Sequence, residues 1–211
     1  MYSARVSFWV LAALGALPAA AQVEHQQHPP RSSEEYARVL NDPQRDGWQK
    51  PHEVVQALAL RPDEAIADVG AGTGYFSRRF ARHAGTAYAV DIDSNLLARA
   101  AEGAPANHRT ILAAPDDPKL AAKSVDTIFF CDVLHHIGNR PAYYEKLDKA
   151  LRPGGRIVIV DFHKRQTPMG PPLSMRLSAE EVEGELARAG FKKTKEFGFL
   201  PYQYFFVFER K

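Results

Sequence analysis

The stretch IADVGAGTGYFSRRF, residues 66–80, joins an apolar run to a glycine-rich turn and then to a segment with helical spacing. The apolar run predicts a buried strand, and the residues from Tyr75 onward predict a helix. Glycine permits positive φ angles and a close approach of the backbone to a ligand, and the free N–H groups of a following helix face the same place. We therefore expect this turn to hold a ligand.

The sequence on both sides of this stretch alternates between strand and helix patterns. This alternation predicts an α/β fold, with a mostly parallel sheet that helices cover on both faces. The last two predicted strands are joined by GFLPY, residues 198–202, which is short enough for a hairpin, so one edge should be antiparallel. Strands are predicted at residues 64–69, 86–92, 108–114, 125–133, 156–162, 191–197 and 203–209, and helices at 32–40, 51–60, 75–83, 94–103, 140–151 and 178–190.

The composition fits one globular domain. The chain has 211 residues, of which 45% are hydrophobic and 25% charged, enough to bury a sizeable core. The formal net charge of +2 and the absence of a lysine or arginine run give no reason to expect a nucleic-acid partner. The single cysteine, Cys131, excludes an internal disulfide and a cysteine-built zinc site, and its apolar neighbours predict that it packs in the core.

The first residues have the order of an export signal. Arg5 precedes an apolar stretch at residues 6–17, and small residues follow at Ala19 and Ala21. The stretch is shorter than the ~20 residues of a spanning helix, so we predict a periplasmic or secreted protein without stable membrane insertion after cleavage. An uncleaved anchor and a misassigned start codon are the alternatives. The predicted divisions are a signal peptide at 1–21, a flexible leader at 22–31 and a single domain at 32–211.

Acidic residues recur where the predicted strands end. In open α/β sheets, ligands bind beyond the carboxyl ends of the strands. For Asp161 alone, an ordinary helix cap or turn role is favoured. Four acids on one edge nevertheless indicate a functional role. The acids that end the first, second, fourth and fifth strands are Asp68, Asp91, Asp132 and Asp161.

The spacing of the glycine turn distinguishes between classes of ligand. Gly70, Gly72 and Gly74 form G-x-G-x-G, so the third glycine comes one residue too early for the dinucleotide fingerprint, and Tyr75 stands in its place. The turn also lacks a Walker lysine. A pyrophosphate would meet Asp68 with like-charge repulsion, whereas a ligand with a sulfonium and an ammonium group would be attracted. S-adenosylmethionine is such a ligand.

The second strand supplies groups for a nucleoside. Asp91 lies about twenty residues past the turn and can accept hydrogen bonds from both ribose hydroxyls. Ile92 is available to pack on the adenine. NAD would use the same acid, so a NAD-dependent oxidoreductase stays open as an alternative.

Four segments, DVGAGTG, VDID, VDTIFFCDVLHHI and LRPGGRIVIVDF, resemble the successive motifs of class I S-adenosylmethionine-dependent methyltransferases. The resemblance covers residues 51–211. It implies a Rossmann-like, doubly wound, seven-stranded sheet with a reversed final strand, and methyl transfer from S-adenosylmethionine to a small-molecule substrate. An exported, non-catalytic cofactor-binding protein on the same fold is a further alternative. The predicted cofactor-binding residues are Asp68, Gly70, Gly72, Gly74, Asp91, Ile92, Asp116 and Asp132.

The adenine contact departs from the family pattern. Where many members have an aspartate that faces the adenine amino group, this sequence has Ala114. Asp116 or a backbone carbonyl is the expected substitute.

Methyl transfer needs a base only when the acceptor must lose a proton. His135 and His136 are the predicted catalytic residues, because they follow Asp132 closely and one of them can face the cleft. The alternative is that they only cap or pack. A metal site from His135, His163 and Asp161 lacks compact ligand spacing, so no metal is predicted, and His52 is a weaker catalytic candidate.

Three further segments could shape the acceptor pocket. GWQKP, residues 47–51, either folds over the cofactor with Trp48 and Gln49 or packs the N-terminal helix. The proline-rich residues 167–175 lie where a lid belongs. The aromatic residues near the C-terminus predict an inner strand, from which Tyr202 or Tyr204 could reach the site.

Overall fold

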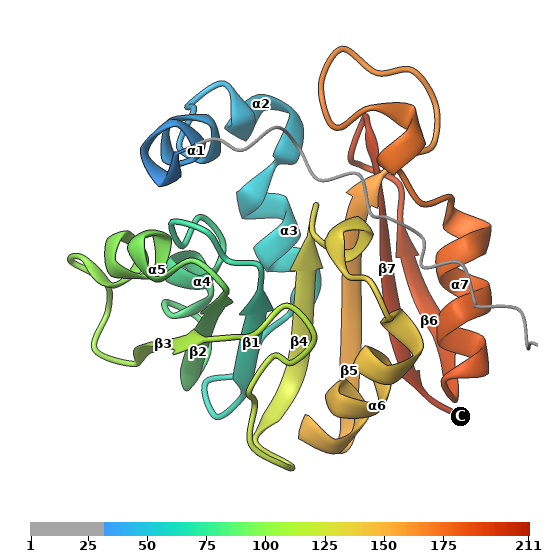
Figure 1. The fold of residues 1–211 in the computed structure, drawn as a ribbon. Coiled ribbons are helices and arrows are strands. Elements are labelled where there is room, and N and C mark those ends of the chain that lie inside the picture. Colours follow the sequence, from blue (N-terminus) through green and yellow to red (C-terminus); the bar gives the residue numbers. More distant parts are fainter. Residues whose placement is uncertain (1–31) are drawn as a thin grey trace, which may run out of the picture.

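Seven strands form one sheet in the computed structural model, which describes residues 32–211 (Figure 1). Their order across the sheet is β3-β2-β1-β4-β5-β7-β6. The predicted signal peptide and leader, residues 1–31, lie outside the described residues. The strands are β1 (Ala65–Val69), β2 (Thr86–Asp91), β3 (His108–Leu112), β4 (Val125–Cys131), β5 (Leu151–Phe162), β6 (Phe191–Phe197) and β7 (Gln203–Arg210).

The first five strands pair in parallel, and β7 runs antiparallel to both β5 and β6. The loop between β6 and β7 is too short for a crossover, so these strands form a hairpin. At the other side of β7, Gln203 pairs in register with Phe162 of β5. The predicted seven-stranded sheet with a reversed C-terminal strand is confirmed.

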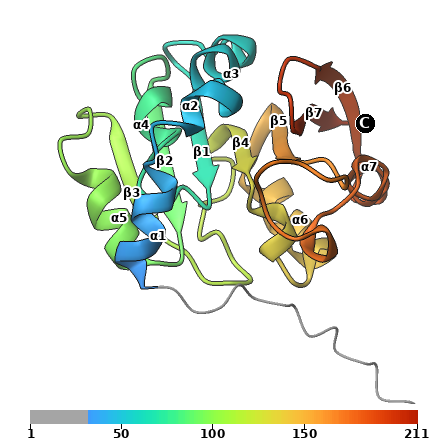
Figure 2. The same ribbon diagram turned by 90° about the horizontal axis from the view of Figure 1, so that it is seen from above.

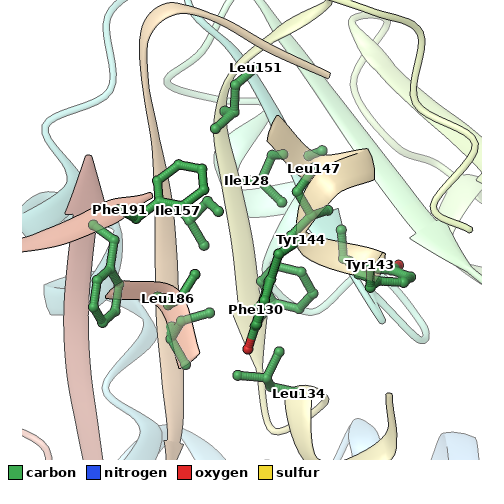
Figure 3. Close-up of a cluster of buried hydrophobic side chains, with 14 of the residues drawn as sticks. Ile128, Phe130, Leu134, Tyr143, Tyr144, Leu147, Leu151, Ile157, Leu186 and Phe191 are labelled. Carbon is green, nitrogen blue, oxygen red and sulfur yellow. The ribbon is translucent and has the colours of Figure 1, made fainter. Parts of the chain in front are cut away.

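The central strand β4 shows why the sheet is covered on both faces. Its VDTIFFC run places Phe129 and Phe130 on opposite sides, and both side chains are fully buried. Phe129 packs in the cluster that contains α3 (Pro51–Leu58) and α4 (Ser77–Phe80). Phe130 packs with residues of α6 (Arg140–Ala150) and α7 (Ala179–Arg188), as Figure 3 shows. Figure 2 shows α6 and α7 on the other side of the sheet from α3.

The remaining helical elements lie near the carboxyl ends of the parallel strands or beside the sheet. Helices α1 and α2 lie over the edge of the sheet at which β1 and β4 end (Figure 1). We call residues 32–50, which contain these two helices, the N-terminal arm. The elements not yet given are α1 (Ser33–Leu40), α2 (Arg45–Gln49), α5 (Ser94–Ala101), η1 (Leu134–His136) and η2 (Leu173–Met175).

Local chemistry explains how the arm is built. Ser32 and Glu35 form a reciprocal capping box at the start of α1. Lys50 has a φ of 46°, which ends α2, and Pro51 then begins α3 in a new direction. The sequence did not predict α2, because a single helical turn has too few residues to show a period.

Two predicted boundaries were wrong. The helix predicted at 75–83 is regular only from Ser77 to Phe80, because the glycine turn holds the preceding residues in successive turns. The fifth strand begins at Leu151 instead of residue 156, and its pairing with β4 includes a register shift between Val125 and Thr127. The irregular part of β5 contains Gly154 and Gly155, and a β-bulge lets a strand continue through such residues.

Candidate active site

Four aspartates lie along one edge of the sheet, as the sequence indicated. Because the strand order is β2, β1, β4, β5, the acids follow one another in the order Asp91, Asp68, Asp132, Asp161. Asp91 is the last residue of β2, and Asp132 follows directly on β4. The helix-cap or turn role favoured for Asp161 alone was wrong, because this residue lies inside β5 and is fully buried.

The glycine turn has the backbone conformation that requires glycine. The φ angles of Gly70, Gly72 and Gly74 are 75°, 56° and 84°. A Cβ atom on Gly72 would lie 2.5 Å from Cδ1 of Leu40, which belongs to α1. The N-terminal arm therefore packs directly against the turn, and Asn41 reinforces this contact by accepting a 2.7 Å hydrogen bond from the hydroxyl of Thr73.

Asp68 links the strand before the turn to the helix after it. Its carboxylate accepts a 2.9 Å hydrogen bond from the backbone N–H of Ser77, the first residue of α4. Burial raises the pKa of Asp68 to about 7, although this hydrogen bond opposes the shift. The hydrogen bonds and positive charges that the protein places near Asp68 therefore do not fully offset the cost of burying its ionised form.

Asp91 and its neighbours provide both polar and apolar groups. The carboxylate accepts hydrogen bonds from the backbone N–H groups of Gly72, at 2.7 Å, and Asp93, at 3.0 Å. Burial raises its pKa above the ordinary value. Ile92 is 61% exposed and Leu112, the register partner of Asp91 on β3, is 57% exposed. Sequence reasoning missed Leu112, although its position at the end of the adjacent strand was a usable signal.

The loop after β3 turns toward α6. Ala114 and Asp117 form an isolated bridge, so the residues between them make a tight turn. Lys146 of α6 donates a hydrogen bond to the backbone carbonyl of Asp116, whose side chain is 81% exposed. The predicted adenine contact of Asp116 stays a prediction.

Asp132 is held in an unusual position. Its φ of 58° lies in the left-handed region, which side-chain-bearing residues rarely adopt. Nε2 of Gln203 donates a 2.6 Å hydrogen bond to Oδ1 of its carboxylate. Burial and the neighbouring Asp161 raise the pKa of Asp132 to about 7. Sequence reasoning missed Gln203, because it contacts a residue 71 positions away.

The two adjacent histidines have different surroundings. His135 is buried, and its Nδ1 lies 3.1 and 3.2 Å from the two carboxylate oxygens of Asp161. Burial lowers the pKa of His135, but the hydrogen bond and the charge of Asp161 outweigh it and raise the pKa above its ordinary value. His136 is exposed. In the neutral tautomer whose Nδ1–H donates to Asp161, Nε2 of His135 is the unprotonated nitrogen and can accept a proton.

The segment GWQKP spans the end of the N-terminal arm and the first residue of α3, and it packs against the sheet. Gln49 is fully buried and donates a 2.6 Å hydrogen bond to Gln203. The Trp48 ring packs 5.5 Å from the ring of Phe162 and 6.4 Å from that of Tyr202. Of the two roles considered for this segment, packing is evident, and a cofactor contact stays a prediction.

The loop after β5 is organised around one cation. Arg176 is buried and donates to four backbone carbonyls of this loop, and its guanidinium lies 5.0 Å from the centre of the Phe162 ring. The loop thus has a fixed shape beside the carboxyl end of β5. The carbonyls belong to His163, Arg165, Met169 and Pro171.

The other candidates are placed as follows. Tyr204 is buried, and its hydroxyl lies 3.5 Å from the carbonyl of Leu177. His163 is half-buried, and His52 is exposed on α3. Within residues 32–211, no group of three or more His, Cys, Asp or Glu side chains is arranged to hold a metal ion. No helix in this range has the length and apolar character needed to cross a membrane.

These residues fit S-adenosylmethionine. The raised pKa values of Asp68, Asp91 and Asp132 indicate carboxylates that a cation would stabilise. Asp91 retains lone pairs for ribose hydroxyls beyond the two that it uses. Ile92 and Leu112 leave apolar surface exposed at the same edge, where an adenine can be covered.

Comparison with known proteins agrees with this geometry. Residues 67–159 match the family model of the methyltransferase domain. The chain is 28% identical over 123 residues to phosphoethanolamine N-methyltransferase 1 of Arabidopsis thaliana, covering 55% of this chain and 24% of that protein. It is also 28% identical to a probable S-adenosylmethionine-dependent methyltransferase of Mycolicibacterium smegmatis, over 69% of this chain and 59% of that protein.

The fold is shared with solved structures. A methyltransferase from Aquifex aeolicus superimposes with a TM-score of 0.79 over 86% of this chain and all of that chain, at 21% identity. The described domain has the Rossmann-like methyltransferase fold, and the chain is similar to class I S-adenosylmethionine-dependent methyltransferases. The chain spans only about a quarter of the length of the plant relative.

Proposed function

We propose that the protein transfers a methyl group from S-adenosylmethionine to a small-molecule nucleophile by direct in-line displacement. The observation that carries this proposal is the row of four aspartates beside a glycine turn in which φ is positive at Gly70, Gly72 and Gly74. Three of these acids have raised pKa values, which favours a cationic ligand over a dinucleotide. The methyltransferase family match also disfavours the NAD-dependent alternative.

Each part of the site has a separate task. S-adenosylmethionine, when bound, supplies a methyl group on a sulfonium that an aligned nucleophile can attack. Asp91 holds the ribose, and Ile92 and Leu112 cover the adenine. Asp68 and Asp132 attract the positive charges of the methionine half. His135 lies at the adjacent strand end, where it can accept a proton from the acceptor, and Asp161 orients its ring.

We further propose that the acceptor atom is an amine nitrogen. Several relatives of the chain are named phosphoethanolamine N-methyltransferases. The acidic edge gives a physical reason for the same preference, because the carboxylate of Asp161, beside His135, attracts an ammonium group before it loses its proton. His135 lies within hydrogen-bonding distance of Asp161 and is the base that the same edge supplies.

Incubation with isotopically labelled S-adenosylmethionine and a set of small amines, with phosphoethanolamine among them, tests both statements. We expect label in an amine and stoichiometric release of S-adenosylhomocysteine. Transfer to an oxygen, sulfur or carbon nucleophile alone would overturn the amine assignment but support the methyltransferase. Binding of S-adenosylhomocysteine without transfer to any fraction of a cell extract would favour the non-catalytic alternative.

A further inference from the structure

Four side chains form a continuous chain of hydrogen bonds from the N-terminal arm to the site. Arg45 Nε donates to Gln49 Oε1 at 3.1 Å, and Gln49 Nε2 donates to Gln203 Oε1 at 2.6 Å. Gln203 Nε2 then donates to Asp132 Oδ1 at 2.6 Å. We call this chain the amide relay. Both glutamines are almost completely buried, so water does not compete for these bonds.

The direction of the amide relay is fixed by its first member. A guanidinium can only donate, so Gln49 must present its carbonyl oxygen to Arg45 and its NH₂ group to Gln203. The same reasoning orients Gln203, whose NH₂ group must then face Asp132. The chain therefore ends at an acceptor, and a negatively charged carboxylate is the strongest acceptor among side chains. Reversing either amide would break its hydrogen bonds at both ends.

We propose that Gln49 and Gln203 are positioning residues that hold Asp132 as a carboxylate, with its remaining lone pairs available to the ammonium group of the donor's methionine half. This inference rests on the proposed function. The backbone alone does not secure the carboxylate, because the φ of 58° at Asp132 is strained. Asp161 also repels a negative charge at this position.

Several charged or titratable groups act on Asp132 besides the amide relay. Asp161 on β5 opposes its ionisation, whereas Arg45 on α2 and His135 on η1 favour it. Gln203 donates a 2.6 Å hydrogen bond to the carboxylate, and the Cys131 thiol donates a weaker one at 3.6 Å. Loss of Gln203 should therefore shift the balance toward the protonated form of Asp132. The groups whose charges interact with Asp132 are Arg45, Cys131, His135, Asp161, Arg176 and Tyr204.

The amide relay also couples the site to the N-terminal arm. Arg45 and Gln49 both belong to α2, and Arg45 additionally donates to the carbonyl of Leu40, the residue that covers Gly72. The arm that packs on the glycine turn is thus the same element that orients Asp132. We therefore expect the packing of the arm on the glycine turn and the orientation of Asp132 to form together.

A double-mutant cycle measured by calorimetry on the full chain tests the amide relay, with S-adenosylhomocysteine as the ligand because it carries the same ammonium group. At pH 7.5 we expect Gln203→Leu to weaken binding about 10-fold. The Asp132→Asn variant should weaken it at least as much, and the double variant should bind no more weakly than Asp132→Asn alone. Gln56→Leu, at an exposed position on α3, is the control and should bind as the parent does.

The pH dependence separates positioning from a merely structural role. If Gln203 acts through the carboxylate, the affinity of Gln203→Leu should approach that of the parent at pH 9, where Asp132 ionises without help. The proposal would be overturned if the loss of binding free energy in Gln203→Leu were additive with the loss in Asp132→Asn. It would also be overturned if the loss in Gln203→Leu stayed constant between pH 7 and pH 9. Gln49→Leu is measured in the same cycle, so a folding defect of one variant does not decide the result. Failure of the parent itself to bind would contradict the proposed function instead.

Discussion

Nδ1 of His135 lies 3.1 Å from a carboxylate oxygen of Asp161, and both side chains are buried at adjacent strand ends. The pair is formed between residues 26 positions apart that the parallel alignment of β4 and β5 brings together. This contact fixes the Nδ1 edge of the imidazole ring toward the carboxylate of Asp161. The pair is the firmest geometric argument for His135, over His136, as the base.

Replacing Asp161 by Asn should lower the pKa of His135, because the hydrogen bond and charge that raise it are lost. A histidine whose pKa is raised on folding stabilises the native state below its unfolded pKa of about 6.5, and this contribution disappears as the pH rises through the folded value. The destabilisation by Asp161→Asn should therefore be larger at pH 5.5 than at pH 8.5. NMR titration of the ring protons measures the shift, with His83→Asn as an exposed control; an unchanged His135 titration would contradict the pairing.

Substitution of Asp91 by Ala should weaken the binding of S-adenosylmethionine by about 1–3 kcal/mol, the range for a buried hydrogen-bonding group left unpaired. The substitution also removes the acceptor for the Gly72 and Asp93 N–H groups, so the melting temperature should be recorded for each variant. Asp63→Ala, at an exposed position before β1, is the matched control. Equal affinities of Asp91→Ala and the parent would exclude Asp91 from the ribose site.

Donor binding should release protons near neutral pH. Burial raises the pKa of Asp68 and Asp132 to about 7, so a cationic ligand that prefers their ionised forms displaces protons. In the protein without ligand, the effect of these two acids on folding stability has the opposite pH dependence to that of a salt-bridged acid, because their pKa values are raised on folding instead of lowered. The folded state holds more protons than the unfolded state between about pH 4 and pH 7, and stability falls as the pH rises through this window. Calorimetry of S-adenosylmethionine binding in buffers of different ionisation enthalpy measures the release, and zero release at pH 6.5 would argue against both acids.

Placing Ala at Gly72 should destabilise the protein by about 1–3 kcal/mol through left-handed backbone strain and the clash with Leu40. The Leu40→Ala substitution should relieve only the clash, so the double variant should be more stable than the sum of the single effects predicts. Gly198→Ala has open space around it and is the control. If the changes in the free energy of unfolding, measured with urea, are strictly additive for the two substitutions, Leu40 of α1 does not contact the turn at Gly72.

Export stays a prediction, since residues 1–31 lie outside the described part of the chain. Cleavage after Ala21 should leave Gln22 as the new N-terminus and should not change the stability of the domain. N-terminal sequencing of the protein from its native host decides this. A chain that begins at Met1 in the cytosol would contradict export.

The sequence predicted the features that depend on local pattern. The apolar run of β4, the glycine spacing and the acids at the strand ends all follow from neighbours in the chain, and they were sufficient for the sheet and its functional edge. The amide relay was not predictable, because Gln49 and Gln203 meet across 154 positions and neither carries a recognisable motif. The role of Asp161 was misjudged because a single acid near the end of a predicted strand has the sequence pattern of a helix cap. Its buried partner, His135, lies 26 positions away and could not be identified from the sequence.

The loop that Arg176 organises has a consequence for the diversification of this protein. One side chain ties down four carbonyls, so the shape of the loop depends little on the identity of the residues between them. Exposed positions such as Gln166 and Pro168 can then change without a loss of loop form. Under the proposed function, we expect substitutions at those positions to alter the choice of acceptor, while the donor site, built on other strands, keeps its form.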